Sequence, residues 1–224
     1  MPTAESVIKE LKKHSDPKSL EGMARFGINV KYALGVRIPD VRKIAKEIGK
    51  DHNLAISLWK TKIHDARILA TMIDEKGKVT EAQMESWVKD FNSWDLCDQC
   101  IANLFEDTEF AYEKAVEWAK REEEYVRRAG FVLMARLAVS DKKAPDSKFE
   151  PFYLLIRKYS IDERNFVKKA VNWAIRQIGK RNKTLNKKMI ILSKELLKTD
   201  SKAARWSASD ALRELESAAV KNRL

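Results

Sequence analysis

Five segments of similar pattern recur along the chain, and this repeat constrains the fold more than any other feature. Each is a helix-forming stretch with small residues, usually alanine, near one reference position, and an amphipathic stretch such as residues 111–120 precedes it. Helical pairs that repeat every ~30–47 residues are typical of HEAT and armadillo proteins. The sequence therefore predicts an all-α fold, an α-solenoid (superhelix) of HEAT-like/armadillo-type helical repeats, in a single domain over residues 1–224. An irregular helical bundle is the alternative. The aligned reference positions are Arg67, Asp98, Arg128, Lys169 and Ser207.

Residues that break secondary structure are scarce, with 7 glycines and 5 prolines in 224 residues. A β-rich fold needs turn residues more often than this, so the composition favours helices. We expect one helix from about Val7 that ends before Pro17, one that opens at Pro39, and one that starts after Thr80. The polar segment 140–147 is predicted to be a loop but not a domain boundary, because the repeat continues across it.

The positive charge is concentrated in the C-terminal part of the chain. The formal net charge is +11, yet residues 1–140 hold 23 basic and 23 acidic residues, so the whole excess lies in residues 141–224. A concentrated basic excess suits a polyanion, because lysine and arginine displace counterions from phosphates. A solvated lysine surface is the plainer alternative. We find no apolar run long enough to span a membrane and no secretory signal, so we expect an intracellular, cytoplasmic protein.

Both cysteines lie in the stretch NSWDLCDQC, residues 92–100, in a C-x-x-C spacing. On a helix, Cys97, Cys100, Ile101 and Leu104 form one continuous apolar stripe, which predicts that the cysteines pack in the core. A zinc site would need two more ligands, and a redox pair would need a βαβ context. We therefore expect free thiols, no metal and no cofactor.

Trp94 and Asp98 are one helical turn apart, at the edge of that apolar stripe. Asp98 is also the one carboxylate among basic reference positions, and a surface meant only to hold phosphates gains nothing from it. This makes Asp98 a candidate functional residue, with a salt bridge to Arg67 or Arg128 as the structural alternative. Asp95 points away from the stripe and is expected to be a solvated or helix-start acid and not a catalytic one.

Two basic pairs precede apolar helical stretches, Arg127–Arg128 and Lys168–Lys169. In each pair one side chain can line a groove while the other extends along the surface. Trp173 follows Lys169 by four residues and is either a second groove residue or part of the core. We assign the other tryptophans to packing; they are Trp59, Trp87, Trp118 and Trp206.

Common enzyme motifs are missing from the sequence. There is no glycine-rich phosphate loop and no G-x-S-x-G elbow. The three histidines, His14, His52 and His64, are too scattered to indicate a base–nucleophile pair.

Several segments together resemble the AlkD-type DNA alkylation repair glycosylases. Three of them match the signature segments of that family in order and with similar spacing, and two N-terminal segments match its opening helices. The resemblance runs from about residue 5 to the end of the chain. The segments are SWDLCDQC (93–100), EEYVRRAGF (123–131), FVKKAVNWAIRQIGK (166–180), MARF (23–26) and GVRIPDVRKIAKEI (35–48).

The resemblance implies a HEAT-like solenoid whose concave basic face holds duplex DNA that contains alkylated bases. It implies hydrolysis of the N-glycosidic bond of cationic alkylpurines, 7-methylguanine and 3-methyladenine, as the first step of base excision repair. Family members are monofunctional, use no metal and do not depend on a base-binding pocket of the flipping type. We expect a monomer that acts on DNA.

Carried over residue by residue, Asp98 corresponds to the catalytic carboxylate of the family. Trp94 and Trp173 correspond to the aromatic residues that contact the lesioned nucleotide, and Arg128 to an arginine near the lesion phosphates. Two positions depart from the pattern, because Phe26 stands where some members have tyrosine and Ser93 where relatives can carry tryptophan. Further DNA contacts are predicted for Arg67, Arg127, Lys168 and Lys169.

Two other functions stay open on the sequence alone. A non-catalytic solenoid could recognise damaged or branched DNA, which predicts salt-sensitive binding without base release. A protein-binding HEAT scaffold would show no affinity for DNA, and it leaves Asp98 among basic positions unexplained.

Overall fold

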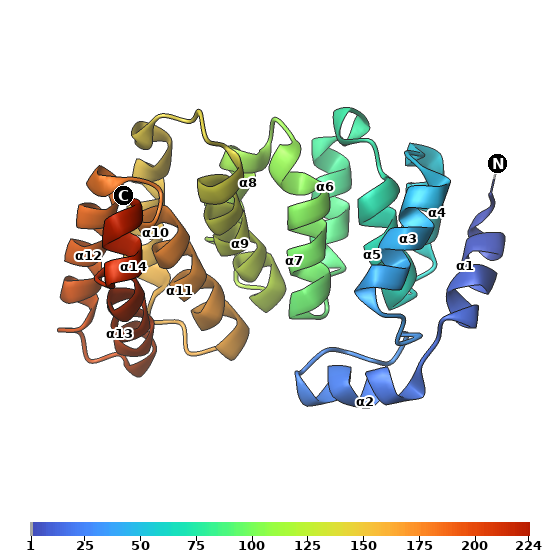
Figure 1. The fold of residues 1–224 in the computed structure, drawn as a ribbon, viewed down its shortest axis with the longest axis horizontal. Coiled ribbons are helices and arrows are strands. Elements are labelled where there is room, and N and C mark those ends of the chain that lie inside the picture. Colours follow the sequence, from blue (N-terminus) through green and yellow to red (C-terminus); the bar gives the residue numbers. More distant parts are fainter. Residues whose placement is uncertain (1) are drawn as a thin grey trace. The chain divides into compact units, whose positions relative to one another are not determined.

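The computed structural model describes residues 2–224, and these residues form helices and connecting segments without a β-strand. The chain divides into two compact units, Met1–Thr108 and Glu109–Leu224, each described by itself below (Figure 1). The all-α prediction is confirmed. Unit 1 holds α1 (Ala4–Lys13), α2 (Pro17–Arg25), α3 (Ile38–Ile48), α4 (His52–Lys60), α5 (His64–Ile73), η1 (Lys76–Lys78), α6 (Glu81–Lys89), α7 (Trp94–Asn103) and η2 (Phe105–Asp107). Unit 2 holds α8 (Ala111–Trp118), α9 (Glu124–Ser140), η3 (Asp146–Phe149), α10 (Glu150–Tyr159), α11 (Asn165–Gly179), α12 (Lys183–Leu196), α13 (Lys202–Leu215) and α14 (Ala218–Arg223).

In unit 1 the helices pack as neighbouring pairs. Helix α5 packs against its pair partner α4 and also against α3 and α7, so the helices that carry Arg67 and Asp98 are adjacent. The indole rings of Trp59 in α4 and Trp87 in α6 stack with centroids 3.9 Å apart, and both side chains are buried. The predicted packing role of these two tryptophans is confirmed.

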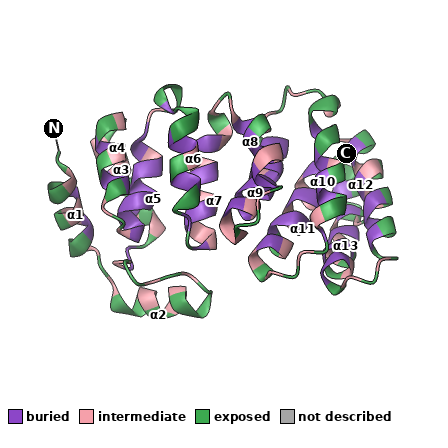
Figure 2. Cartoon of the chain, turned by 180° about the vertical axis from the view of Figure 1, so that it is seen from behind, coloured by how far each residue is buried: buried purple, intermediate pink, exposed green. Residues whose placement is uncertain are grey.

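Unit 2 repeats this arrangement along a longer row. The row α9, α11 and α13 is formed by the second helices of three successive pairs, and the first helices α8 and α12 pack on α9 and α13. Trp118 in α8 is fully buried, as predicted. Figure 2 shows that α9 and α11 are largely buried along their length. The repeating helical pairs inferred from the sequence are therefore present in both units.

Local sequence signals explain where helices begin and end. Pro39 lies in the first turn of α3, and Gly49 ends that helix with φ 78°, in the left-handed region that favours glycine. The Thr80 hydroxyl accepts a hydrogen bond from the amide of Gln83 at the start of α6. Helix α1 ends before Pro17, as predicted, but Pro17 also opens a further helix, α2, which was not predicted. The segment between α9 and η3 is a loop, as predicted.

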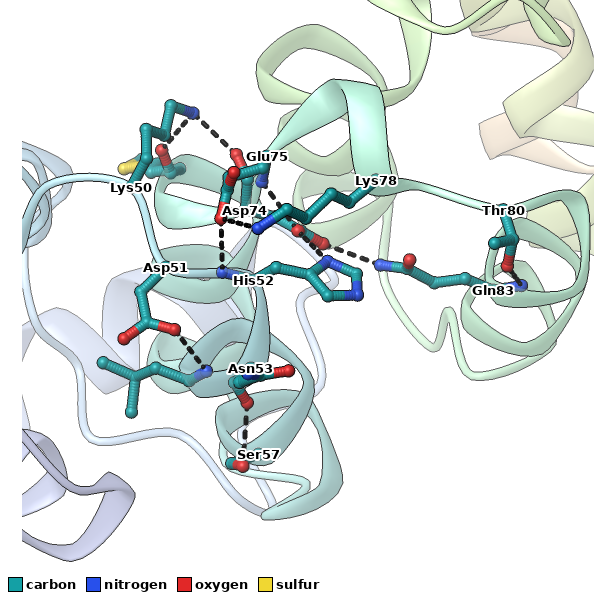
Figure 3. Close-up of polar contacts among 12 residues, drawn as sticks. Lys50, Asp51, His52, Asn53, Ser57, Asp74, Glu75, Lys78, Thr80 and Gln83 are labelled. Carbon is teal, nitrogen blue, oxygen red and sulfur yellow. Dashed lines mark hydrogen bonds and ion pairs between the residues drawn. The ribbon is translucent and has the colours of Figure 1, made fainter.

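A buried carboxylate joins three helices of unit 1. Asp74, at the end of α5, is fully buried and accepts hydrogen bonds from Nδ1 of His52 at 2.7 Å and from Nε2 of Gln83 at 2.6 Å (Figure 3). The ammonium of Lys50 donates to the backbone carbonyls of Met72 and Asp74. This network ties α4, α5 and α6 together, because His52 lies in α4 and Gln83 in α6.

Candidate functional site

The first two turns of α7 carry the candidate residues Trp94 and Asp98. Cys97, Cys100 and Ile101 form a completely buried stripe along this helix, so the predicted apolar stripe is confirmed. Both cysteines are free thiols. The stripe anchors α7 in the core of unit 1 and leaves Trp94 and Asp98 half-buried at its edge.

Trp94 and Asp98 both line a cavity of about 530 Å³ in unit 1. Its size falls in the range of small-ligand sites, and its wall combines many apolar groups with a few polar ones. The wall comes from α2 and the segment after it, from the start of α3, and from the first turns of α5 and α7. Side chains that line it include Met23, Phe26, Ile28, Ile38, Ile68, Trp94, Asp95, Asp98 and Gln99.

The indole of Trp94 is held by the end of α2. Its Nε1 donates a hydrogen bond to the backbone carbonyl of Phe26 at 3.0 Å. Helix α2 itself contributes no buried residue to the core, and the Phe26 side chain is 74% exposed. Because the bond uses the carbonyl, the replacement of tyrosine by Phe26 leaves this contact intact.

Asp95 is an acid of the first turn of α7, which was one of its two expected roles, but it is not solvated. Its carboxylate lies 2.8 Å from Nε2 of His64, which is only 4% exposed at the start of α5. Burial opposes ionisation of Asp95, but the hydrogen bond and charge of His64 outweigh it and lower the pKa of Asp95 below its ordinary value. Since α5 and α7 lie side by side, the pair fixes the first turn of α7 from which Trp94 and Asp98 project.

Arg67 occupies the core of unit 1 and not an open surface. It is 6% exposed, its Nη2 lies 2.8 Å from Oδ2 of Asp90, and its Nε donates to the carbonyl of Trp59 at 3.1 Å. Burial lowers the pKa of Arg67, and the charge of Asp90 offsets only part of that effect. Arg67 therefore pairs with Asp90 and not with Asp98. The predicted DNA contact stays untested, but this geometry favours a structural role.

The arginine pair of α9, in unit 2, is also engaged within the protein. Arg128 is 5% exposed and its Nη1 donates to the carbonyl of Phe166 in α11 at 2.6 Å. Arg127 forms an ion pair with Asp162 at 2.7 Å and lies over the ring of Tyr159. These contacts lock α9 onto the segment that leads into α11. Arg127 also lines a cavity of unit 2 with Tyr159 and Asp162, so the expectation that one of the two arginines lines a groove is compatible with this geometry, and a DNA contact by either stays a prediction.

The lysine pair of α11 faces solvent more openly. Lys169 is exposed, and Lys168 and Trp173 are half-buried. Trp206 on α13 was assigned to packing, and this assignment is wrong, because its side chain is 43% exposed. The ammonium of Lys168 lies 5.0 Å from the Trp206 ring centroid. A helical repeat aligned on small residues gave no signal for this exposure.

The aligned reference positions do not share one surface environment. Arg67, Arg128 and Ser207 are buried, whereas Asp98 is half-buried and Lys169 is exposed. Three of the five side chains are therefore covered by the rest of the protein and do not belong to one exposed basic surface with a single carboxylate.

Two further properties bear on function. Across residues 2–224, no group of three or more histidine, cysteine or acidic side chains is arranged to hold a metal ion. In that same part of the chain, no helix is both long and apolar enough to cross a membrane.

Comparison with known proteins agrees with the fold. The family model described as "DNA alkylation repair enzyme" matches residues 7–215. A solved structure described as "a new family of proteins related to the HEAT-like repeat DNA glycosylases with affinity for branched DNA structures" matches with a TM-score of 0.79 at 20% identity, over 95% of this chain and 94% of that chain. A solved engineered protein matches with a TM-score of 0.41 at 14% identity, over 96% and 99%. No curated protein matches. The predicted α-solenoid of HEAT-like repeats is confirmed.

Proposed function

The chain belongs to the DNA alkylation repair enzyme family, and we propose that it is a monofunctional DNA glycosylase that releases cationic alkylpurines, such as 7-methylguanine and 3-methyladenine, from duplex DNA. The observation that carries this proposal is that Trp94 and Asp98 line one cavity of about 530 Å³ in unit 1. The cavity thus combines a carboxylate with an aromatic face.

The chemistry of the reaction suits these two residue types. An alkylated purine with a positive charge is already a good leaving group, and breaking its bond to the sugar leaves oxocarbenium character on the sugar. The Asp98 carboxylate stabilises that charge and orients or deprotonates the attacking water. The Trp94 indole, held by the Phe26 carbonyl, presents an aromatic face that attracts cationic character, worth about 0.5–2 kcal/mol.

Contacts with the DNA backbone are assigned to unit 2. Lys168 and Lys169 on α11 supply positive charge for phosphates, and Trp173 on the same helix supplies a second aromatic contact with the damaged nucleotide. Arg128 is retained as a contact near the lesion phosphates, in line with the family resemblance. The basic excess of residues 141–224 supports DNA as the polyanion.

The test is release of 7-methylguanine from methylated duplex DNA, measured as free base by chromatography under single-turnover conditions. We expect release by wild type and a loss of about 100-fold or more in Asp98→Asn, because the substitution removes the charge and keeps the shape. Asp107→Asn, at an exposed site that pairs with Lys76, is the matched control and should behave like wild type. A folded wild type that binds DNA but releases no base contradicts the proposal.

A second candidate is a DNA-binding protein without excision activity that recognises branched DNA. The observation that favours it is the likeness in fold to a solved structure from a family described as having affinity for branched DNA. This function predicts tighter binding to a four-way junction than to duplex DNA of equal length, with no base release from either. Equal affinity for the two DNAs argues against it.

A further inference from the structure

Trp206 is a large aromatic side chain that the fold of unit 2 does not use as core. Its neighbours on α13, Ala204 and Ser207, are fully buried, while Trp206 is 43% exposed with the Lys168 ammonium over its ring. A single exposed apolar side chain is common on protein surfaces and by itself indicates nothing. Trp206 differs from such isolated side chains in the positive charges that lie around it.

Helices α11 and α13 run parallel along their contact. The Ser207 hydroxyl donates to the carbonyl of Lys168, and Asn172 Nδ2 donates to the carbonyl of Ser207 at 2.9 Å. Further along, Arg176 Nη1 lies 2.9 Å from Oε2 of Glu214. The N-terminal halves of both helices, with Lys168 and Trp206, therefore lie at the same end of the pair.

The cations of α11 differ between its two halves. In the C-terminal half, Arg176 and Lys180 are both paired with the Glu214 carboxylate of α13. In the N-terminal half, Lys168 and Lys169 have no carboxylate within 4.0 Å among residues 2–224. Positive charge is thus neutralised at one end of the helix pair and left uncompensated beside Trp206 at the other.

We propose that Trp206, Lys168 and Lys169 form a binding site for an unpaired DNA nucleotide. The base stacks on the Trp206 indole, and the two ammonium groups hold the flanking phosphates. An aromatic face combined with lysines is the combination by which proteins hold single-stranded nucleic acid. A base inside a duplex is covered on both faces by its neighbours, so this site selects unpaired DNA. The site needs no excision chemistry and does not depend on Asp98.

The test measures fluorescence anisotropy of a labelled twelve-nucleotide oligothymidine with wild type and variants. We expect Trp206→Ala to weaken binding about tenfold and Trp206→Phe to weaken it less, because phenylalanine keeps a stacking face. Lys168→Ala should weaken binding. It should also reduce the slope of log affinity against log salt concentration by the amount that about one phosphate contact contributes. Lys187→Ala, an exposed lysine on α12, is the matched control for charge and should bind within twofold of wild type.

A second oligonucleotide separates stacking from charge. A twelve-nucleotide strand of abasic sites carries the same phosphates and no bases, so Trp206→Ala and wild type should bind it equally. If Trp206→Ala loses affinity equally for oligothymidine and for the abasic strand, the stacking role of Trp206 is overturned. If Lys168→Ala and Lys187→Ala lose equal affinity for oligothymidine, the local charge role of Lys168 is overturned. Failure of wild type to bind oligothymidine overturns the whole site.

This site shares Lys168 and Lys169 with the proposed glycosylase, but variants at Trp206 and Asp98 separate the two readouts. Trp206→Ala should release 7-methylguanine from duplex DNA at the wild-type rate, whereas Asp98→Asn should bind oligothymidine as wild type does. A protein that excises but does not bind oligothymidine contradicts only this inference. A protein that binds oligothymidine but never excises contradicts only the proposed function.

Discussion

The Trp94 indole nitrogen donates a hydrogen bond to the backbone carbonyl of Phe26, 3.0 Å away and 68 positions earlier in the chain. The bond joins α7, which is anchored by a buried cysteine stripe, to α2, which buries no residue of its own. Helix α2 forms part of the cavity wall around Asp98. The orientation of the proposed catalytic tryptophan thus depends on a helix with little packing of its own.

Trp94→Phe tests whether this bond positions the aromatic ring. Phenylalanine keeps an aromatic face but cannot donate, so we expect release of 7-methylguanine to fall about tenfold, in line with one lost hydrogen bond. Affinity for duplex DNA should change less than twofold. Trp206→Phe, at an exposed tryptophan of unit 2, is the matched control. An unchanged excision rate in Trp94→Phe contradicts a positioning role for the bond.

Arg67→Met tests the structural role that burial gives to Arg67. Methionine fills similar space but cannot replace the hydrogen bonds to Asp90 and to the Trp59 carbonyl, so we expect a loss of about 2–4 kcal/mol in unfolding free energy. Urea denaturation measures this loss. Salt-dependent affinity of the folded variant for duplex DNA should equal that of wild type. A reduced salt dependence restores Arg67 as a phosphate contact.

Asp74→Asn tests the buried network of Figure 3. The substitution replaces a carboxylate that accepts from His52 and Gln83 with an amide that can accept through one oxygen only. We expect a loss of about 2–3 kcal/mol in unfolding free energy, because a buried donor is left without an acceptor. Asp51→Asn, which keeps a side-chain oxygen at the cap of α4, should cost much less, under about 0.5 kcal/mol, because asparagine caps a helix about as well as aspartate. Equal losses would mean that the network adds nothing beyond a cap.

Much of the fold was predictable because its signals are local. Glycine at the end of α3, threonine before α6 and proline in the first turn of α3 each act through their own backbone. The apolar stripe of Cys97 and Cys100 was predictable for the same reason, since helical periodicity alone decides which residues share a face.

The features that the sequence did not predict correctly share a different physical cause. Periodicity says which side chains lie on one face of a helix, but a neighbouring helix decides whether that face is covered. Asp95 was expected in solvent because nothing in the sequence shows that His64, 31 positions earlier, lies against it. Trp206 was expected in the core because tryptophan is usually buried. The burial of Arg67 was hidden from the sequence for the same reason, because its partner Asp90 lies 23 positions later in the chain.

Asp162→Asn tests the ion cluster that leads into α11 through its pH dependence. Burial disfavours the charged form of Asp162, but hydrogen bonds from Arg164 and Arg127 outweigh it and lower the pKa of Asp162 to about 2. A carboxyl whose pKa is lowered by folding stabilises the folded protein at pH values above the pKa of the unfolded chain. This stabilisation is lost as the pH falls through the pKa of the folded protein. We expect the unfolding free energy of wild type to exceed that of Asp162→Asn by about 1 kcal/mol at neutral pH. This difference should vanish between about pH 4 and pH 2. Asp200→Asn, at an exposed site, should show no such pH dependence.

Gly130→Ala tests the close approach of α9 to α8. A Cβ atom at position 130 would lie 2.3 Å from the backbone nitrogen of Ala119, and backbone cannot move aside as a flexible side chain does. We expect a loss of about 3 kcal/mol or more in unfolding free energy from overpacking. Gly22→Ala is the matched control, because a Cβ on that helical glycine of α2 meets nothing within 4 Å. The unfolding free energy of this control should rise by about 0.5–1 kcal/mol, because alanine has a higher helix propensity than glycine. Thermal denaturation followed by circular dichroism measures both variants, and a Gly130→Ala protein as stable as wild type contradicts the close packing of the two helices.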